Sequence, residues 1–161
     1  MHNPRPVRVA AEEGLPVMAE GFIQDRDSSR RFFIEVWKKY NAGMPLQPLE
    51  ELILGVIREH PEYHNYLQEE DSLTREFTPE TGTTNPFLHM GMHIAIREQV
   101  ASDRPPGIAC IYQQLAKSAA SVHDLEHRLM DCLGETLWRA QRDNTLPDET
   151  AYLECLEKLI Q

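Results

Sequence analysis

The sequence predicts an all-α fold, a single-domain bundle of five or six helices that follows an irregular N-terminal arm. Two observations support this prediction. Apolar residues recur at the three- and four-residue spacing of amphipathic helices, and residues that start or stop helices bound these stretches. In addition, no segment alternates apolar and polar residues for more than a few positions, as a half-buried strand would.

The first predicted helix begins at Asp27, in the segment D-S-S-R-R-F-F-I-E-V-W-K-K-Y. It starts with acidic and serine residues, carries an aromatic stripe at Phe33 and Trp37, and has lysines near its end. Gly43 and two prolines close it. A second helix is predicted from about Pro48 through L-E-E-L-I-L-G-V-I-R-E-H, where another proline intervenes.

The third predicted helix starts after the polar, turn-rich stretch 65–85. Asn85 is its expected N-cap and Pro86 its first residue. This helix would be apolar on nearly every side, which is typical of a central, buried helix, and D-R-P-P-G-I stops it. Three more helices are predicted: a short one at about 108–116, a long one at about 120–142, and a last one that starts in T-L-P-D-E-T.

The chain has 161 residues, the size of one domain. We expect an arm at residues 1–24, either mobile or docked on a partner subunit of a homodimer, and a helical metal-binding domain at residues 25–161. A net charge of -10 disfavours nucleic acid and anionic lipid surfaces as partners. No apolar stretch reaches about 18 residues, so no membrane span is predicted.

The three cysteines, Cys110, Cys132 and Cys155, lie far apart in the sequence and show no C-x-x-C spacing. Each has apolar neighbours at helical spacing, so we expect buried, reduced thiols. The first residues contain no apolar run of signal-peptide length. Both observations favour a cytoplasmic location.

Six of the seven histidines form three pairs with one spacing of four residues. The pairs are His60 and His64, His89 and His93, and His123 and His127. If the histidines were placed at random in a chain of this length, the expected number of such pairs would be only about 0.3, so three pairs are a clear excess. Residues four apart lie on one face of a helix, so each pair can present two imidazoles to one metal ion.

The expected orientation differs between the pairs. His89 and His93 share their helix face with core residues and should point inward, whereas the pair on the long helix lies at the edge of its apolar arc. Pro61 is expected to end the second helix at His60 and to open a new turn that contains His64. The two members of this first pair are then expected to point in different directions.

Carboxylates could complete the site. Glu62, Glu126 and Glu135 are candidate ligands, and Asp124 and Glu126 are candidate catalytic bases. Imidazole suits iron, zinc, nickel and copper, and added carboxylates suit iron or manganese. Six imidazoles exceed the four ligands of a zinc ion, so a dinuclear site is predicted, with iron favoured over zinc or manganese.

Partial likenesses to known metal sites leave the reaction open. A site with many histidines and few acids resembles that of hemerythrin, although its H-x-x-x-E ligands find no match here. The segment H-D-L-E-H resembles the zincin motif H-E-x-x-H, with Asp124 in the place of the base. The dyad of His123 and Asp124 also resembles the histidine-aspartate metal phosphohydrolases.

Four segments, H-P-E-Y-H, N-P-F-L-H-M-G-M-H, D-R-P-P-G-I and L-G-E-T-L-W-R-A-Q-R, resemble a small proteobacterial family whose domain has no known function. The resemblance covers about residues 28 to 158. It implies a bacterial origin and brings no activity, cofactor or site residue.

The sequence therefore favours a metal-binding helical bundle, with oxygen or redox chemistry on a small molecule if the metal is iron. One alternative is a metal-dependent hydrolase, in which metal-activated water attacks the substrate. The other is a non-catalytic interaction or scaffold protein whose histidines are structural. Whether the protein turns over a substrate is left open by the sequence.

Overall fold

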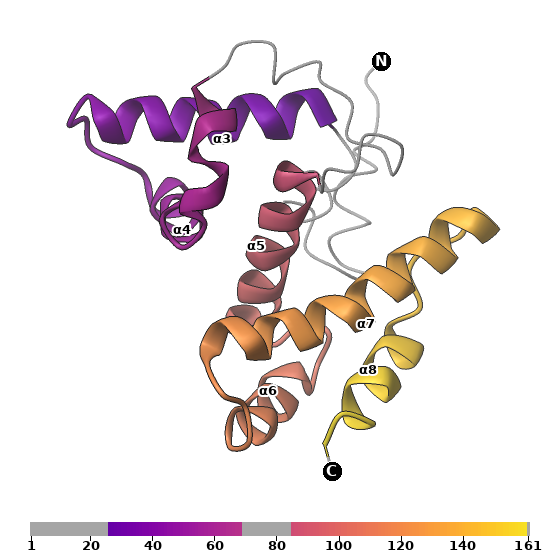
Figure 1. Ribbon diagram of the computed structural model, residues 1–161. Coiled ribbons are helices and arrows are strands. Elements are labelled where there is room, and N and C mark those ends of the chain that lie inside the picture. The colour runs from indigo at the N-terminus through magenta and orange to yellow at the C-terminus, as the bar shows by residue number, and fades with distance from the viewer. Residues whose placement is uncertain (1–25, 69–84, 161) are drawn as a thin grey trace, which may run out of the picture. The chain divides into compact units, whose positions relative to one another are not determined.

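The computed structural model describes residues 26–68 and 85–160, and every regular element within these ranges is helical (Figure 1). The elements are α3 (Arg26–Asn41), α4 (Pro48–Arg58), the 3-10 helix η1 (Pro61–Leu67), α5 (Pro86–Ser102), α6 (Ile108–Ala116), α7 (Val122–Asp143) and α8 (Glu149–Glu157). The predicted all-α class is confirmed. The helix count is slightly higher than predicted, because the residues after Pro61 form a short helix of their own. The predicted arm at residues 1–24 lies outside the described residues.

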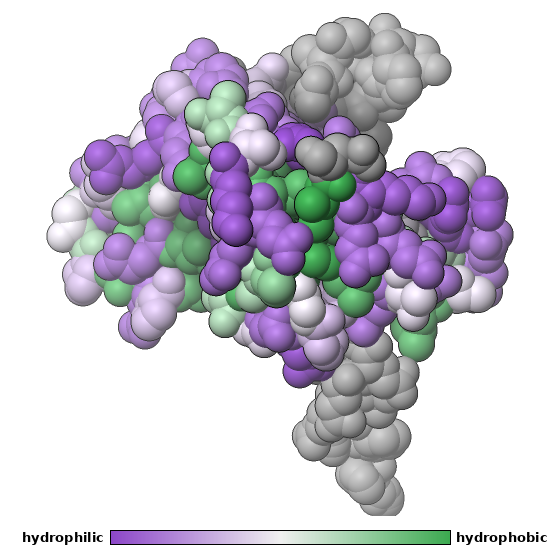
Figure 2. Space-filling view, turned by 90° about the horizontal axis from the view of Figure 1, so that it is seen from below, coloured by the Kyte–Doolittle hydropathy of each residue, from purple (hydrophilic) through white to green (hydrophobic). Residues whose placement is uncertain are grey.

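The described residues fall into two compact units that divide between Ile94 and Ala95, within α5. The N-terminal unit contains described residues 26–68 and 85–94, and the C-terminal unit contains residues 95–160. Among the described helices, none has the length and apolar character needed to cross a membrane. The face seen in Figure 2 is largely hydrophilic with scattered hydrophobic residues, in keeping with a chain that is 26% charged.

The N-terminal unit is built around the aromatic stripe of α3. Phe33 and Trp37 are buried as predicted, and Phe33 lies 6.0 Å from the ring of Phe87 at the start of α5. The apolar face of α4 packs on α3, and Leu67 of η1 completes the core beside them. Burial of these side chains is the main stabilising term for helices of this length.

Helix α5 starts at the cap that the sequence predicted. The Asn85 Oδ1 atom accepts hydrogen bonds from the backbone N–H groups of Phe87, at 3.0 Å, and Leu88, at 3.1 Å. Pro86 follows at the first helical position, where its missing N–H has no intrahelical acceptor to lose.

Replacing Asn85 with Ala should lower the free energy of unfolding by about 1 kcal/mol, because two N–H groups lose their side-chain acceptor. Chemical denaturation measures this change. Asn85→Asp keeps an acceptor oxygen at the same position and should stay within about 0.5 kcal/mol of the parent. Equal stability of the Ala and Asp variants would contradict the assigned cap.

The C-terminal unit joins α6, α7 and α8 around one apolar core. Asp103 sets the start of α6, because its Oδ1 atom accepts the N–H groups of Gly107, at 3.1 Å, and Ala109, at 3.0 Å. Gly107 has φ 104°, in the left-handed region that a side chain disfavours. The core side chains are Ile108, Ile111, Leu115, Leu125, Leu129, Leu133, Tyr152 and Leu156.

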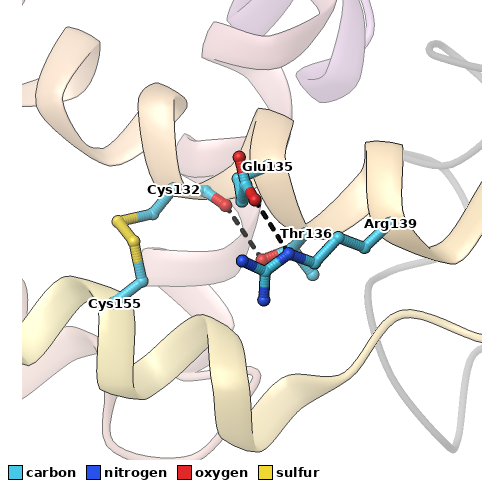
Figure 3. Close-up of a disulfide and its surroundings, with 5 residues drawn as sticks. All are labelled: Cys132, Glu135, Thr136, Arg139 and Cys155. Carbon is cyan, nitrogen blue, oxygen red and sulfur yellow. Dashed lines mark hydrogen bonds and ion pairs between the residues drawn. A yellow bond between two sulfur atoms is a disulfide. The ribbon is translucent and has the colours of Figure 1, made fainter.

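A disulfide joins the last two helices and corrects the prediction of three reduced, buried thiols. Cys132 of α7 and Cys155 of α8 are bonded, with their Cα atoms 5.8 Å apart, and the remaining cysteine, Cys110, is exposed (Figure 3). Helical spacing placed each cysteine beside apolar residues but could not show that two of these helix faces meet. The disulfide also removes the cysteine argument for a cytoplasmic location, which stays a prediction.

Candidate metal centre

His60 lies between α4 and η1, directly before the proline that starts η1. Pro61 cannot continue the helix, and the His60 backbone N–H turns back to the Ile57 carbonyl at 3.0 Å. The His60 Nδ1 atom lies 2.8 Å from the Val56 carbonyl oxygen, which can only accept, so Nδ1 donates the proton. The neutral ring then carries its lone pair on Nε2. Metal-binding histidines are commonly oriented by such a bond to a backbone carbonyl.

His64 has different surroundings, as the position of Pro61 predicted. Its Nε2 atom lies 2.8 Å from the Ile57 carbonyl oxygen, and its ring lies 4.4 Å from the ring of Trp37. The structure therefore places His64 against α3, with Nε2 as a proton donor to the backbone.

Helix α5 brings two further imidazoles to His60. The ring centroids of His89 and His93 lie 4.9 Å apart, and the His60 centroid lies 5.1 Å from the first and 4.7 Å from the second. His60 and His93 are buried, with 1% and 0% exposure, and His89 is partly buried. We call these three residues the histidine triad.

The distance between the Nε2 atoms of His89 and His93 is 3.3 Å. Two nitrogen ligands with bonds of 2.0–2.1 Å at a tetrahedral metal lie about 3.3–3.4 Å apart. The same distance allows one ring to donate its proton to the other in the absence of metal. This distance therefore fits two states of the pair. Without metal, one ring donates an N–H hydrogen bond to the other, and with metal, both Nε2 atoms bind one ion.

Tyr63 lies beside the triad and was missed by the sequence analysis. Its ring stacks on His60 with an interplanar angle of 2° and a centroid distance of 5.5 Å, and it meets the His89 ring edge-on at 5.9 Å. Burial is the main cause that raises the pKa of Tyr63. The sequence signal that could have pointed to Tyr63 is its place between the two histidines of H-P-E-Y-H.

The C-terminal unit carries the third histidine pair. His123 and His127 lie in the first turns of α7, and their ring centroids are 4.2 Å apart. Ser121 begins this helix, and its Oγ atom accepts the N–H of Asp124 at 3.0 Å. Both rings are partly buried. We call these two residues the α7 histidine pair.

The predicted carboxylates occupy different environments. Glu126 is buried, and its two oxygens accept bonds from Arg97 at 2.8 and 3.2 Å. Such a bidentate pair engages both carboxylate oxygens. Asp124, Glu62 and Glu135 are exposed, and the last accepts a bond from an arginine one turn later in α7. Among the predicted metal ligands, those that are buried or partly buried are therefore mostly histidines.

Glu98 of α5 is half-buried, and its Oε1 atom accepts no hydrogen bond from the described residues. Desolvation raises the pKa of this carboxyl above its ordinary 4.5. The folded protein therefore takes up this proton at a higher pH than the unfolded chain does. Its contribution to stability is present at low pH and is lost as the pH rises through the folded pKa.

Replacing Glu98 with Gln should accordingly raise the Tm at pH 7, because a partly desolvated charge is removed. The gain should shrink as the pH is lowered from 7 through the raised pKa of the parent carboxyl, which then becomes protonated. Thermal unfolding of both proteins across this range measures the difference. A difference that is absent, or that does not change with pH, would show that burial does not disfavour this charge.

Comparison with known families identifies this domain. The family described as Domain of unknown function (DUF1841) matches residues 25–158, nearly the same region as the predicted resemblance. The chain belongs to the DUF1841 family. No curated protein and no solved structure gives a significant match. The function of this DUF1841 domain must therefore be inferred from its side chains, and its bacterial origin stays a prediction.

Proposed function

We propose that this protein binds a transition metal through the histidine triad, and that the α7 histidine pair supplies further ligands. The observation that carries the proposal is the convergence of three imidazoles, one from the N-cap of η1 and two from α5, with two Nε2 atoms 3.3 Å apart. In the N-terminal unit, His60 and His93 of the triad can each offer one ring nitrogen as a ligand, and in the C-terminal unit both members of the α7 histidine pair can do the same.

The proposed ligand set favours an iron, zinc, copper or nickel ion over magnesium or calcium, because imidazole is a softer donor than oxygen. Five imidazoles exceed the four ligands of a zinc ion. We therefore favour iron, in one six-coordinate or two adjacent sites, with redox chemistry on a small molecule. The hydrolase alternative is less well supported, since Asp124 is exposed and Glu126 is engaged by Arg97.

Metal reconstitution of protein made without a polyhistidine tag tests this proposal. We expect at least one equivalent of metal per chain after anaerobic loading with ferrous iron, and a visible ferric absorption band after exposure to air. Parallel samples receive zinc, manganese or nickel. Less than about 0.2 equivalent with every metal would overturn the proposal and favour the scaffold reading. A colourless protein that retains only zinc and cleaves an ester would favour the hydrolase.

A further inference from the structure

The disulfide lies at a cleft in the C-terminal unit, and none of the proposed metal ligands lines this cleft. The cleft has a volume of about 580 Å³ and is formed by the second half of α7, the following turn and α8. Cys155 lines it and Cys132 does not. The cleft is large enough for a small peptide-sized ligand.

The two cysteines of the disulfide differ in exposure. Cys132 is buried, with 3% exposure, and Cys155 is partly exposed and faces the cleft. Thiol-disulfide exchange begins with attack of a thiolate on one sulfur, and access decides which sulfur is attacked. A thiolate in the cleft would reach Cys155, and Cys132 would then be the leaving group.

The cleft carries charges of both signs. Its lining includes the basic residues Arg139, Arg142 and Lys158 and the acidic residues Glu135, Asp143, Asp148 and Glu154. Figure 3 shows the Arg139 side chain lying along α7 on its ion pair with Glu135, at 2.8 Å. This pair is about half exposed, and exposed ion pairs contribute little to stability. This ion pair can therefore open, and each of its two side chains can then pair with an opposite charge on a ligand.

We propose that this cleft binds a small zwitterionic thiol, of the glutathione type, which exchanges with the Cys132–Cys155 disulfide. The ligand's carboxylates would pair with the basic residues of the cleft, and its ammonium group with the acidic ones. Its thiolate attacks the Cys155 sulfur, a mixed disulfide forms there, and the bond to Cys132 breaks with Cys132 leaving as a thiolate. A second thiol then attacks the mixed disulfide, so that two thiols are oxidised to one disulfide and both cysteines are reduced.

The intact protein provides the first test, in a Cys110→Ser background that removes the exposed free thiol. Reduced glutathione should open the disulfide about tenfold faster than 2-mercaptoethanol at equal thiolate concentration, because charged groups in the cleft concentrate the ligand. Arg139→Gln should reduce this advantage. Equal rates for the two thiols, or no effect of the Arg139 variant, would overturn the binding part of the proposal.

Trapping the mixed disulfide tests which sulfur reacts. With Cys132→Ser in the same background, oxidised glutathione should modify Cys155, as seen by mass spectrometry of the intact chain and of its peptides. With Cys155→Ser, the buried Cys132 should remain unmodified. Both variants lack the disulfide and serve as matched controls for stability, and circular dichroism confirms that each is folded. Equal modification of the two variants would overturn the assigned direction of attack.

Discussion

His93→Ala should lower metal content at least tenfold and abolish the stabilisation of the protein by metal. His93 is fully buried, and its ring lies next to both other members of the triad. A ligand that binds only the folded state contributes roughly 3 kcal/mol to stability at a concentration 100 times its Kd. The Tm of the parent should therefore fall on chelation, and that of the variant should not change. Elemental analysis and thermal unfolding measure the two effects.

His64→Ala is the matched control for this experiment. It removes an imidazole from the same unit, in a segment directly next to that of His60, but from a ring that contacts Trp37 and the Ile57 carbonyl. Metal content should stay at the parent level. If the two variants lost equal amounts of metal, or if neither lost any, the assignment of the triad as the metal ligands would be wrong.

Removing the disulfide should cause a large loss of stability in the C-terminal unit. The bond closes a loop with a sequence separation of 23, and a loop of this length is expected to contribute roughly 3 kcal/mol by restricting the unfolded chain. The double variant Cys132→Ser, Cys155→Ser should therefore unfold at a much lower denaturant concentration. Chemical denaturation of the oxidised and the reduced parent measures the same quantity without a substitution.

Cys110→Ser is the control for the cysteine substitutions, because this residue is exposed and outside the disulfide. It should leave stability within about 0.5 kcal/mol of the parent. If reduction of the parent left the denaturation midpoint unchanged, the bond would contribute nothing to the folded state of the C-terminal unit.

Local sequence signals predicted much of the fold. Asn85 and Pro86 marked the start of α5, and the aromatic stripe of α3 identified its buried face, because capping and helical periodicity depend on near neighbours. Pro61 likewise separated His60 from His64, which the structure gives different contacts. Spacing by four residues correctly brought each α5 and α7 pair of imidazoles together.

Contacts between distant segments were beyond the sequence argument. Periodicity shows which face of a helix is apolar but not which partner covers it, so the bond between Cys132 and Cys155 was missed. The same limit applies to Glu126, because its spacing could not show that both of its oxygens accept bonds from Arg97, and its role as a metal ligand stays a prediction. The position of Tyr63 beside the triad likewise depends on the folding of η1, which the sequence argument did not predict.

X-ray absorption spectroscopy of the metal-loaded protein tests the central proposal most directly, because it identifies the atoms bound to the metal. We expect at least three imidazole nitrogens at about 2.0–2.2 Å from the ion. Their number should fall in the His123→Ala variant if the α7 histidine pair completes the site. A first shell of oxygen atoms alone, or one with sulfur ligands, would contradict a metal centre built on His60, His89 and His93.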